Sequence, residues 1–415
     1  MKIAIVGAGW SGCHVALELA EHGHQVILLE RMSSIFAGVS GQFGIRLHKG
    51  PHYPRSRATR EACLATFERF CARYPQLVVE HDYSIYAQGR VDATGRPSKV
   101  SNQVFASVCH ESEACYQVDL QTSGFTGIEA AYNLYEPSIA LGERLRSFFT
   151  AELNNAGVEV RNSCEIVSTQ QVSGQQRLLA QDGWQLDVDR VINATGYQSL
   201  VSRSLDVGEG VDMEVVYQVC IGLEYEDSQP SQKPFSFIVM DGWFPCLMPL
   251  VESESPWPRN YVLTHGSYTI LGSFARLEQA ETLLQTLDDG LVTSLIRPFA
   301  EQEMCRFWAA FSPRFRYTGW KGVVQAKLKT RSEFRGSVVF QQGGVIHVFP
   351  GKISNVLQAG DEVIALLGND ACLEHNGLCY VAGGVLDSAR QEIRNKPLAN
   401  EQNTANLQTY KILSA

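Results

Sequence analysis

The sequence predicts a mixed α/β protein in which a Rossmann-like domain is interleaved with an α+β domain built on an antiparallel sheet. The first observation is a glycine-rich turn between a short apolar strand and a helix, within residues 2–29. Strand–helix patterns return near residues 140–200 and 335–385, whereas residues 210–275 alternate apolar and polar positions in short runs separated by Pro and Gly. One domain is therefore expected to be interrupted twice by the other.

The expected domain boundaries follow from these shifts in pattern. We assign the segments as follows: 1–60, 140–205 and 332–395 to the Rossmann-like domain, 61–139 and 206–331 to the second domain, and 396–415 to a polar tail.

The first thirty residues contain a complete β-α-β unit. Lys2–Val6 is a short apolar run typical of a buried parallel strand, and Gln25–Leu29 is a second one. Between them, Trp10–His22 has helical periodicity, and Gly23 gives it a C-terminal stop. This unit is the frame for the glycine motif.

Gly7, Gly9 and Gly12 form the pattern G-x-G-x-x-G at the turn between strand and helix. Gly7 permits the tight turn, Gly9 lets a pyrophosphate approach the backbone, and Gly12 lets helix and strand pack closely. The helix N-terminus, at Trp10 and Ser11, offers N–H groups and partial positive charge to phosphates. A glycine-rich turn without a ligand is the alternative interpretation, and the motif alone does not separate FAD from NAD.

Glu30 ends the second strand about 20 residues after the motif, where a carboxylate accepts hydrogen bonds from ribose hydroxyls. Arg31 follows it. Because an acid rather than a base occupies position 30, a 2′-phosphate is disfavoured at this site.

The rest of the chain is expected to contain further helices, strands and turns. We predict helices at Glu61–Tyr74, Leu141–Asn155, Leu277–Phe299, Gln302–Phe311 and Val356–Leu367; strands at Val158–Val160, Asp189–Asn193, Val338–Phe340 and Val345–Phe349; a turn at Arg90–Pro97; and a strand-rich region at Val104–Val118.

Bulk properties limit the possible partners. The 415 residues carry a net charge of −9, which disfavours nucleic acid and anionic membrane surfaces as main partners. A small anionic substrate is still compatible, since a local pocket can be basic. No run of about 18 apolar residues predicts a membrane span. Eleven cysteines without a CxxC pair, and no signal-peptide pattern, lead us to expect reduced thiols and a cytoplasmic location. The oligomeric state is left open.

Four motifs, in this order along the chain, resemble the D-amino acid oxidase superfamily of FAD-dependent oxidoreductases. They are the glycine cradle Gly7–Arg31, the run F-G-I-R-L-H-K-G-P-H-Y-P-R-S at the start of Phe43–Cys63, D-R-V-I-N-A-T-G at Asp189–Gly196, and F-P-G-K-I-S-N at Phe349–Asn355. The second resembles the flavin loop of L-2-hydroxyglutarate and glycerol-3-phosphate dehydrogenases, with His48, Gly50 and Tyr53 at the His, Gly and aromatic positions. Residues 200–330 match no subfamily.

This resemblance implies a Rossmann-like FAD-binding domain, an antiparallel substrate domain and FAD as cofactor. It implies that the cofactor contacts the following residues: Arg46, Leu47 and His48 of the flavin loop; Ile166 near the adenine; Ala194, Thr195 and Gly196; and Gly351, Lys352 and Ile353. The helix after Gly351 would point its positive end at the flavin and, with Lys352, stabilise the reduced anion. Plain structural turns are the alternative interpretation of these loops.

Candidate catalytic residues lie in the flavin-loop segment and beyond it. Oxidation of an alcohol needs a base, and histidine has a suitable pKa, so His48 and His52 are the candidates. Tyr53 is expected to line the flavin. Arg331, with Arg335, is expected to clamp an anionic substrate, as are Arg46, Arg55 and Arg57. Packing and solvated charge are the alternative interpretations.

Other features carry less information. The aromatic turn Asp241–Pro245 and Tyr268 are candidates for a pocket wall, and Cys13 is expected in the core. No zinc-ligand spacing or Walker phosphate loop is present. The sequence thus predicts an FAD-dependent oxidase or dehydrogenase that oxidises a C–N or C–OH bond of a small amine, amino acid or hydroxy acid. The alternatives are an NAD(P)H-using flavin monooxygenase and a redox-neutral or biosynthetic flavoenzyme acting on a larger or carrier-bound substrate.

Overall fold

The computed structural model describes residues 1–43, 45–112, 114–202, 205–208, 212–253, 258–368 and 372–397. Most of the predicted polar tail, residues 398–415, lies outside the described residues, as does Gly44 of the flavin-loop motif.

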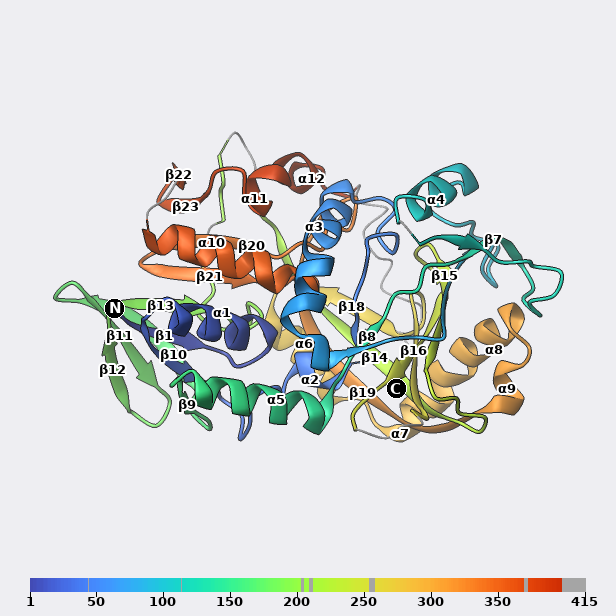
Figure 1. Cartoon of the computed structure of the whole chain (residues 1–415), viewed down its shortest axis with the longest axis horizontal. Coiled ribbons are helices and arrows are strands. Elements are labelled where there is room, and N and C mark those ends of the chain that lie inside the picture. Colours follow the sequence, from blue (N-terminus) through green and yellow to red (C-terminus); the bar gives the residue numbers. More distant parts are fainter. Residues whose placement is uncertain are drawn as a thin grey trace.

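The first sheet holds the predicted β-α-β unit. Its strands are arranged in the order β22 (Cys372–His375), β23 (Leu378–Val381), β20 (Val338–Gln342), β21 (Val345–Phe349), β13 (Arg190–Asn193), β1 (Lys2–Val6), β2 (Gln25–Leu29) and β9 (Glu159–Arg161). The central strands from β21 to β9 are parallel, and β20 and β23 add antiparallel partners. The order brings three distant segments of the chain into one sheet (Figure 1).

Apolar side chains on both faces of this sheet explain its position in the core. Ile3 and Ile5 face helices α1 (Trp10–Glu21), α5 (Gly142–Asn155) and α10 (Val356–Gly368). Ala4 and Val6 face a small antiparallel sheet of β10 (Ile166–Val172), β11 (Gln175–Ala180) and β12 (Gln185–Val188). A strand buried on both faces reads as a continuous apolar run, which is why the sequence identified it.

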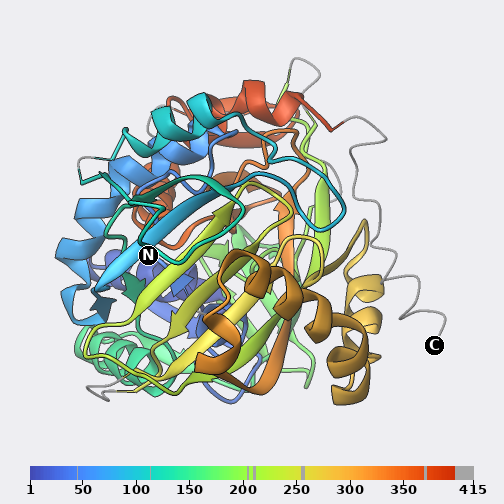
Figure 2. The same cartoon turned by 90° about the vertical axis from the view of Figure 1, so that its right-hand side faces the viewer.

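The second sheet forms the other half of the molecule (Figures 1 and 2). Its strands follow the order β18 (Ile270–Phe274), β14 (Val215–Asp227), β17 (Asn260–His265), β16 (Pro245–Leu250), β15 (Phe235–Met240), β5 (Tyr83–Gly89), β7 (Ile128–Asn133) and β6 (Tyr116–Gln117), and β19 (Phe315–Leu328) pairs with β14. The pairs between 215 and 274 are antiparallel, which confirms the sheet predicted there. β5 and β15 run parallel.

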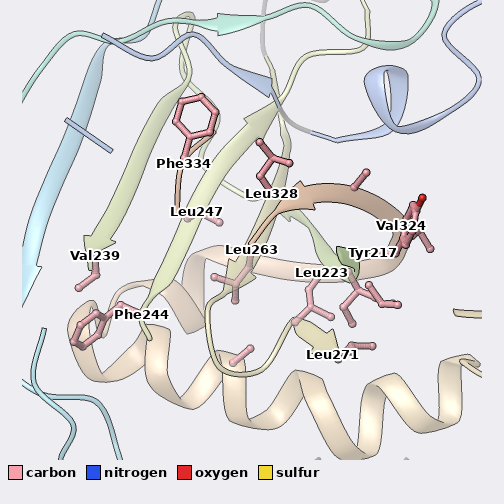
Figure 3. Packing of buried hydrophobic residues seen from close by; sticks show 14 of the residues in the cluster. Tyr217, Leu223, Val239, Phe244, Leu247, Leu263, Leu271, Val324, Leu328 and Phe334 are labelled. Atoms are coloured by element: carbon pink, nitrogen blue, oxygen red, sulfur yellow. The ribbon is translucent and has the colours of Figure 1, made fainter. Parts of the chain in front are cut away.

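The largest apolar core lies on this second sheet. Figure 3 shows Leu223, Leu247 and Leu263 projecting from neighbouring strands. They pack over the helical region, which consists of α6 (Leu277–Gln285), α7 (Asp289–Leu291), the π-helical turn η2 (Val292–Ile296), α8 (Arg297–Phe307) and α9 (Phe311–Arg314). The single helix predicted at Leu277–Phe299 is therefore wrong: Asp288 caps a new helix by accepting the N–H of Leu291, so α6 ends before it.

A short sheet and a long helix connect the two halves. The sheet contains β3 (Ile45–Arg46), β8 (Ser138–Ile139) and β4 (Val78–Val79). Helix α3 (Arg57–Arg73) stands at the middle of the molecule in Figure 1 and packs against α10 and the 3-10 turn η3 (Ile353–Asn355). Ser56 caps α3 by accepting the N–H of Thr59. The shorter elements are α2 (Val39–Gln42), η1 (Pro75–Leu77), α11 (Val385–Ser388) and α12 (Arg390–Arg394).

The strand-rich prediction for Val104–Val118 is wrong. Helix α4 (Asn102–Cys109) occupies most of this region, followed only by β6. Ser101 caps the helix by accepting the N–H of Val104, and Phe105, Val108 and Cys109 form its buried face at helical spacing. A capping serine thus outweighed the β-branched and aromatic residues that suggested a strand. Within the described ranges, no helix is long and apolar enough to cross a membrane.

Candidate active site

The glycine cradle is too tightly packed for side chains at two of its positions. Gly7 has φ +101°, and a Cβ there would lie 2.6 Å from the carbonyl oxygen of Ala194. A Cβ on Gly12 would lie 1.8 Å from the carbonyl oxygen of Gly7. By position, the first-turn amides of Trp10 and Ser11 have no intrahelical acceptor, so the helix start can receive an anion.

We expect Gly12→Ala to abolish cofactor retention, because the added methyl group forces α1 away from β1 and opens the cradle. The measurement is the FAD:protein ratio after purification and the affinity for added FAD, from flavin absorbance. Gly38→Ala is the matched control, since a Cβ at Gly38 meets nothing within 4 Å. Normal FAD content in the Gly12 variant would contradict the assigned role.

Acidic and small residues surround the cradle at the carboxyl ends of β1, β2 and β13. The Glu30 carboxylate is buried and accepts N–H groups of Ala8, at 2.8 Å, and Met32, at 2.9 Å. These bonds fix it beside the turn and leave lone pairs for ribose hydroxyls. Arg31 is exposed and donates to Gln198. Ile166 is buried at the start of β10, against the far face of the sheet.

Thr195 and its neighbours cross directly behind the glycine turn. The Ala194 amide donates to the Val6 carbonyl at 2.8 Å, and the Thr195 hydroxyl donates to Asn193 Oδ1 at 2.7 Å. Gly196 has φ +68°, a conformation that favours glycine. The structure therefore brings the first and third resemblance motifs together.

A buried ionic cluster lies beyond the cradle, built around Glu136. Its Oε2 lies 3.0 Å from Arg46 Nε and 3.4 Å from His48 Nδ1, and it accepts the Tyr86 hydroxyl at 2.6 Å. Its Oε1 accepts the amide of Lys49 at 2.6 Å. Burial raises the pKa of this carboxyl, but Arg46, His48 and Tyr86 outweigh that effect and lower the pKa to about 2. Glu136 is therefore a permanent buried anion that anchors the flavin-loop segment.

The two candidate histidines stack on each other beside this anion. The rings of His48 and His52 lie 4.7 Å apart with 22° between their planes, and Tyr53 meets both edge-on. Burial lowers the pKa of His48 to about 4, although Glu136 partly opposes this. Burial, followed by the charges of His48 and Lys352, holds the pKa of His52 well below its usual range. Both rings are thus neutral near pH 7.

Lys352 approaches this cluster from the loop before η3. Its Nζ lies 4.8 Å over the Tyr53 ring. Burial and the charge of Arg335 lower its pKa to about 7. Gly351 is required because a Cβ there would lie 2.1 Å from the Ser337 amide nitrogen. Ile353 is buried at the start of η3. The contact between Lys352 and Tyr53 therefore joins the motif at Phe349–Asn355 to the motif at Phe43–Cys63.

Unsatisfied buried polar atoms indicate that the cluster is built to hold a further group. Within the described part of the chain, Arg46 makes no hydrogen bond through Nη1 or Nη2, and His52 Nδ1, Ser337 Oγ and Asn355 Oδ1 also have none. Buried polar groups are normally hydrogen-bonded. Both donors and acceptors are represented, which suits the carbonyl, N–H and ring-nitrogen edge of a flavin. Together with the cradle, these residues fit FAD.

A cavity of about 1130 Å³ begins at Pro54 and Arg55, which follow Tyr53 directly in the chain. Its lining includes residues from β14, β18, the end of β19 and the 329–335 segment, and seven of the described lining side chains are basic while three are acidic. The predicted anion clamps Arg331 and Arg335 both lie here, as do Arg55 and Arg57. Arg335 also lowers the pKa of Lys352, so it marks the end of the cavity that is nearer to the Glu136 cluster.

The predicted aromatic turn contributes one cavity wall. The Trp243 ring lies between Arg96 and Lys99, whose cationic groups are 4.3 and 4.2 Å from its centroid. Asp241 binds Arg55 at 2.6 Å. Tyr268 instead packs on His265, and Cys13 is fully buried, as expected. The cysteines are free thiols in this structure.

Sequence reasoning missed the residues that organise the site. Tyr86 lies in β5 and Glu136 in the loop between β7 and β8, both without a recognisable motif. Lys327 lies in β19 among ordinary alternating residues. The one signal for Glu136 was a carboxylate directly before Pro137 in an otherwise apolar stretch. Such a signal is too common to identify a site.

Comparisons with known proteins agree with this geometry. A family model described as FAD dependent oxidoreductase, DAO, matches residues 2–349. The FAD-dependent monooxygenase kojA of Aspergillus flavus is 50% identical over 416 residues, covering 99% of this chain and 97% of the relative. The FAD-dependent monooxygenase FPY4 of Fusarium mangiferae is 24% identical over 371 residues, covering 89% and 92%.

Solved structures share the fold at low sequence identity. Glycine oxidase from Geobacillus kaustophilus has a TM-score of 0.63 and 12% identity, covering 90% of this chain and 95% of that one. NikD, an amino acid oxidase of nikkomycin biosynthesis, has a TM-score of 0.64 and 14% identity, covering 88% and 93%. On the match to residues 2–349 and the 50% identical relative, the chain belongs to the DAO family of FAD-dependent oxidoreductases.

Proposed function

We propose that this enzyme is an FAD-dependent oxidase or dehydrogenase that oxidises a C–OH or C–N bond of a small anionic molecule. The observation that carries the proposal is a pair of stacked neutral histidines, His48 and His52, in the segment that leads directly into Pro54 and Arg55 of a basic cavity of about 1130 Å³. When bound, FAD accepts a hydride from the substrate carbon. The roles below, like the cofactor contacts of the motif residues, are part of this proposal.

The residues of the chain supply binding, orientation and a proton acceptor. Arg335, with Lys327 and Arg331 along the same wall, attracts the anionic group and thereby orients the substrate in the cavity. His52, whose Nδ1 has no partner within the described residues, takes the proton of a substrate hydroxyl. An anionic substrate beside it raises its pKa towards the working pH.

Glu136 acts through its neighbours. It fixes the orientation of the His48 ring and neutralises Arg46. The oriented His48 ring stacks on His52 and thereby holds the His52 ring in place. Lys352 and the start of η3 would place positive charge beside a flavin held at this loop and so would stabilise its reduced anion. In the balanced reaction the substrate loses a hydride and a proton, and an external acceptor, oxygen or another oxidant, takes the two electrons.

A second candidate function is an FAD-dependent monooxygenase, because the 50% identical relative carries that name. A monooxygenase needs an external two-electron donor such as NADPH, and it transfers one atom of O₂ to the substrate. Within the printed sequence, no second G-x-G-x-x-G follows a later strand, so a second nucleotide site of this type is not encoded.

Anaerobic bleaching of the holoenzyme at 450 nm separates the two functions. We expect at least one member of a panel of hydroxy acids, amino acids and phosphorylated polyols to bleach the flavin, and NADPH alone to leave it yellow. On admission of air, the oxidase form yields hydrogen peroxide and a product without ¹⁸O from ¹⁸O₂. Rapid bleaching by NADPH, with ¹⁸O in the product, would instead establish the monooxygenase.

A further inference from the structure

Two basic residues of the cavity lack an acidic partner, and they lie at the end nearest the proposed flavin site. Lys327 projects from β19, and Arg335 lies just before β20. Among the described residues, neither has a carboxylate within ion-pair distance, and the one polar contact of the Arg335 guanidinium is Gln325, at 3.4 Å. This differs from four other basic residues of the cavity, Arg55, Arg57, Lys99 and Lys329, which have carboxylate partners.

Other basic residues of the cavity form ion pairs with carboxylates. Arg55 contacts Asp241 at 2.6 Å and Glu333 at 3.0 Å. Lys99 shares Glu333 at 3.1 Å. In the same way, Lys329 contacts Glu214 at 2.6 Å, and Arg57 contacts Glu61 at 2.6 Å. An incoming anion would have to compete with these paired carboxylates. At Lys327 and Arg335 no carboxylate of the described residues lies within ion-pair distance, and Glu333 acts on Lys327 only through longer-range attraction.

The unpaired charges repel each other. Burial and the charge of Arg335 lower the pKa of Lys327 to about 8, and Arg335 and Lys327 both contribute to the lowered pKa of Lys352. Concentrated positive charge of this kind is unfavourable unless an anion binds it. A carboxylate carries one negative charge and can neutralise only one of the two cations, whereas a dianion can neutralise both Lys327 and Arg335. Arg offers a planar fork of donors and Lys a compact point charge, a combination suited to phosphate oxygens.

The floor beneath the two cations is polar. Across the β14–β19 pairing, Gln218 lies opposite Gln325, and the Gln218 side chain donates to the Ser273 hydroxyl at 3.1 Å. Gln218, Ser273 and Lys327 all line the cavity. Amide and hydroxyl groups of this kind bind the oxygen-rich body of a polar ligand rather than an aliphatic side chain.

We propose that Lys327 and Arg335 form a subsite for a dianionic phosphate group, so that the cavity takes a small phosphate monoester. This inference rests on the proposed function, because it names the class of substrate that the same site would oxidise. No covalent step at the phosphate is involved: the group serves as a handle that orients the C–H bond to be oxidised.

The test measures binding without turnover. The holoenzyme is titrated by calorimetry at pH 7.5 and low ionic strength with inorganic phosphate, methyl phosphate and acetate, each in turn. We expect both phosphates to bind at least about tenfold more tightly than acetate, as charge-assisted bonds to two cations require. Equal affinities for phosphate and acetate, no phosphate binding, or exclusion of methyl phosphate while inorganic phosphate binds would each overturn the proposal.

Lys327→Met and its neighbour Lys329→Met form a matched pair, since each removes one positive charge from the cavity. We expect the first to weaken phosphate binding by at least about tenfold and the second by no more than about twofold. Equal losses would indicate a general field effect and would overturn the subsite. FAD content and the thermal midpoint establish that each variant is folded, and Lys327→Arg is expected to restore binding.

Failure of this proposal is distinguishable from failure of the proposed function. Phosphate binding that depends on Lys327 stands even if no panel compound bleaches the flavin. Conversely, bleaching by an unphosphorylated amino acid, with no phosphate binding that depends on Lys327, would support the proposed oxidase and contradict the phosphate subsite.

Discussion

Glu136→Gln is expected to lower the free energy of unfolding by about 3–5 kcal/mol, because it leaves the buried Arg46 guanidinium without its compensating charge. Arg46 and Glu136 are both almost fully buried, and Arg46 lies 4.4 Å over the Tyr86 ring, where it cannot reach solvent. The measurement is urea unfolding of the apoprotein, together with the affinity for added FAD. We expect FAD binding to weaken as well, since Glu136 anchors the Lys49 amide and His48.

Two comparisons separate lost charge balance from lost packing. Glu303→Gln is the control: Glu303 is just as buried, but its partner Arg306 is 33% exposed and can be solvated by water, so the loss is expected to be smaller. In the double variant Arg46→Met with Glu136→Gln, the unpaired charge is removed, and stability is expected to recover in part. A Glu136 variant as stable as the Glu303 variant would show that Arg46 needs no counter-ion.

Acid is expected to unfold this protein over a narrow range below pH 6.5, because several histidines are buried in the neutral form. Burial lowers the pKa of His14, His81 and His265 to about 3, and that of His48 and His347 to about 4. In the unfolded chain a histidine takes up its proton near pH 6.5. Unfolding between these values therefore binds protons, and the free energy of unfolding falls as the pH falls.

The free energy of unfolding is expected to depend steeply on pH. Each such histidine contributes up to about 1.4 kcal/mol per pH unit between its folded and unfolded pKa values. Carboxyl groups with raised pKa values oppose this: burial raises the pKa of Glu362 to about 7 and also raises the pKa values of Glu18 and Asp241, so the folded state holds those protons more tightly than the unfolded state. Five histidines outweigh these three carboxyl groups, and the urea midpoint is expected to drop sharply from pH 7 to pH 5.5.

Single-histidine variants test the origin of this slope. His14→Asn is expected to reduce the number of protons taken up on unfolding by about one. His110→Asn, at an exposed position, is expected to leave it unchanged. A urea midpoint independent of pH from 7 to 5.5 would mean that the buried histidines are protonated in the folded protein.

The sequence by itself determined the nucleotide-binding half of this protein. Lys2–Val6, Gly7–Gly12 and Glu30 lie within about 30 residues, where local chain geometry alone brings strand, turn, helix and carboxylate together. Helix α10 and strands β20 and β21 were also predictable, because buried strands and amphipathic helices carry their periodicity in consecutive residues. The division of the chain into two domains at the predicted boundaries stays a prediction.

Only the tertiary structure decided which residues share the site. Tyr86 follows Arg46 by 40 residues and Glu136 follows Tyr86 by another 50, yet strand pairing and burial bring Glu136 within 3.0 Å of Arg46 and 2.6 Å of the Tyr86 hydroxyl. The same holds for Lys327, whose uncompensated charge appears only when Lys329, Arg55 and Lys99 are seen to have partners. Charge compensation is a property of three-dimensional neighbours, and sequence patterns report only neighbours along the chain.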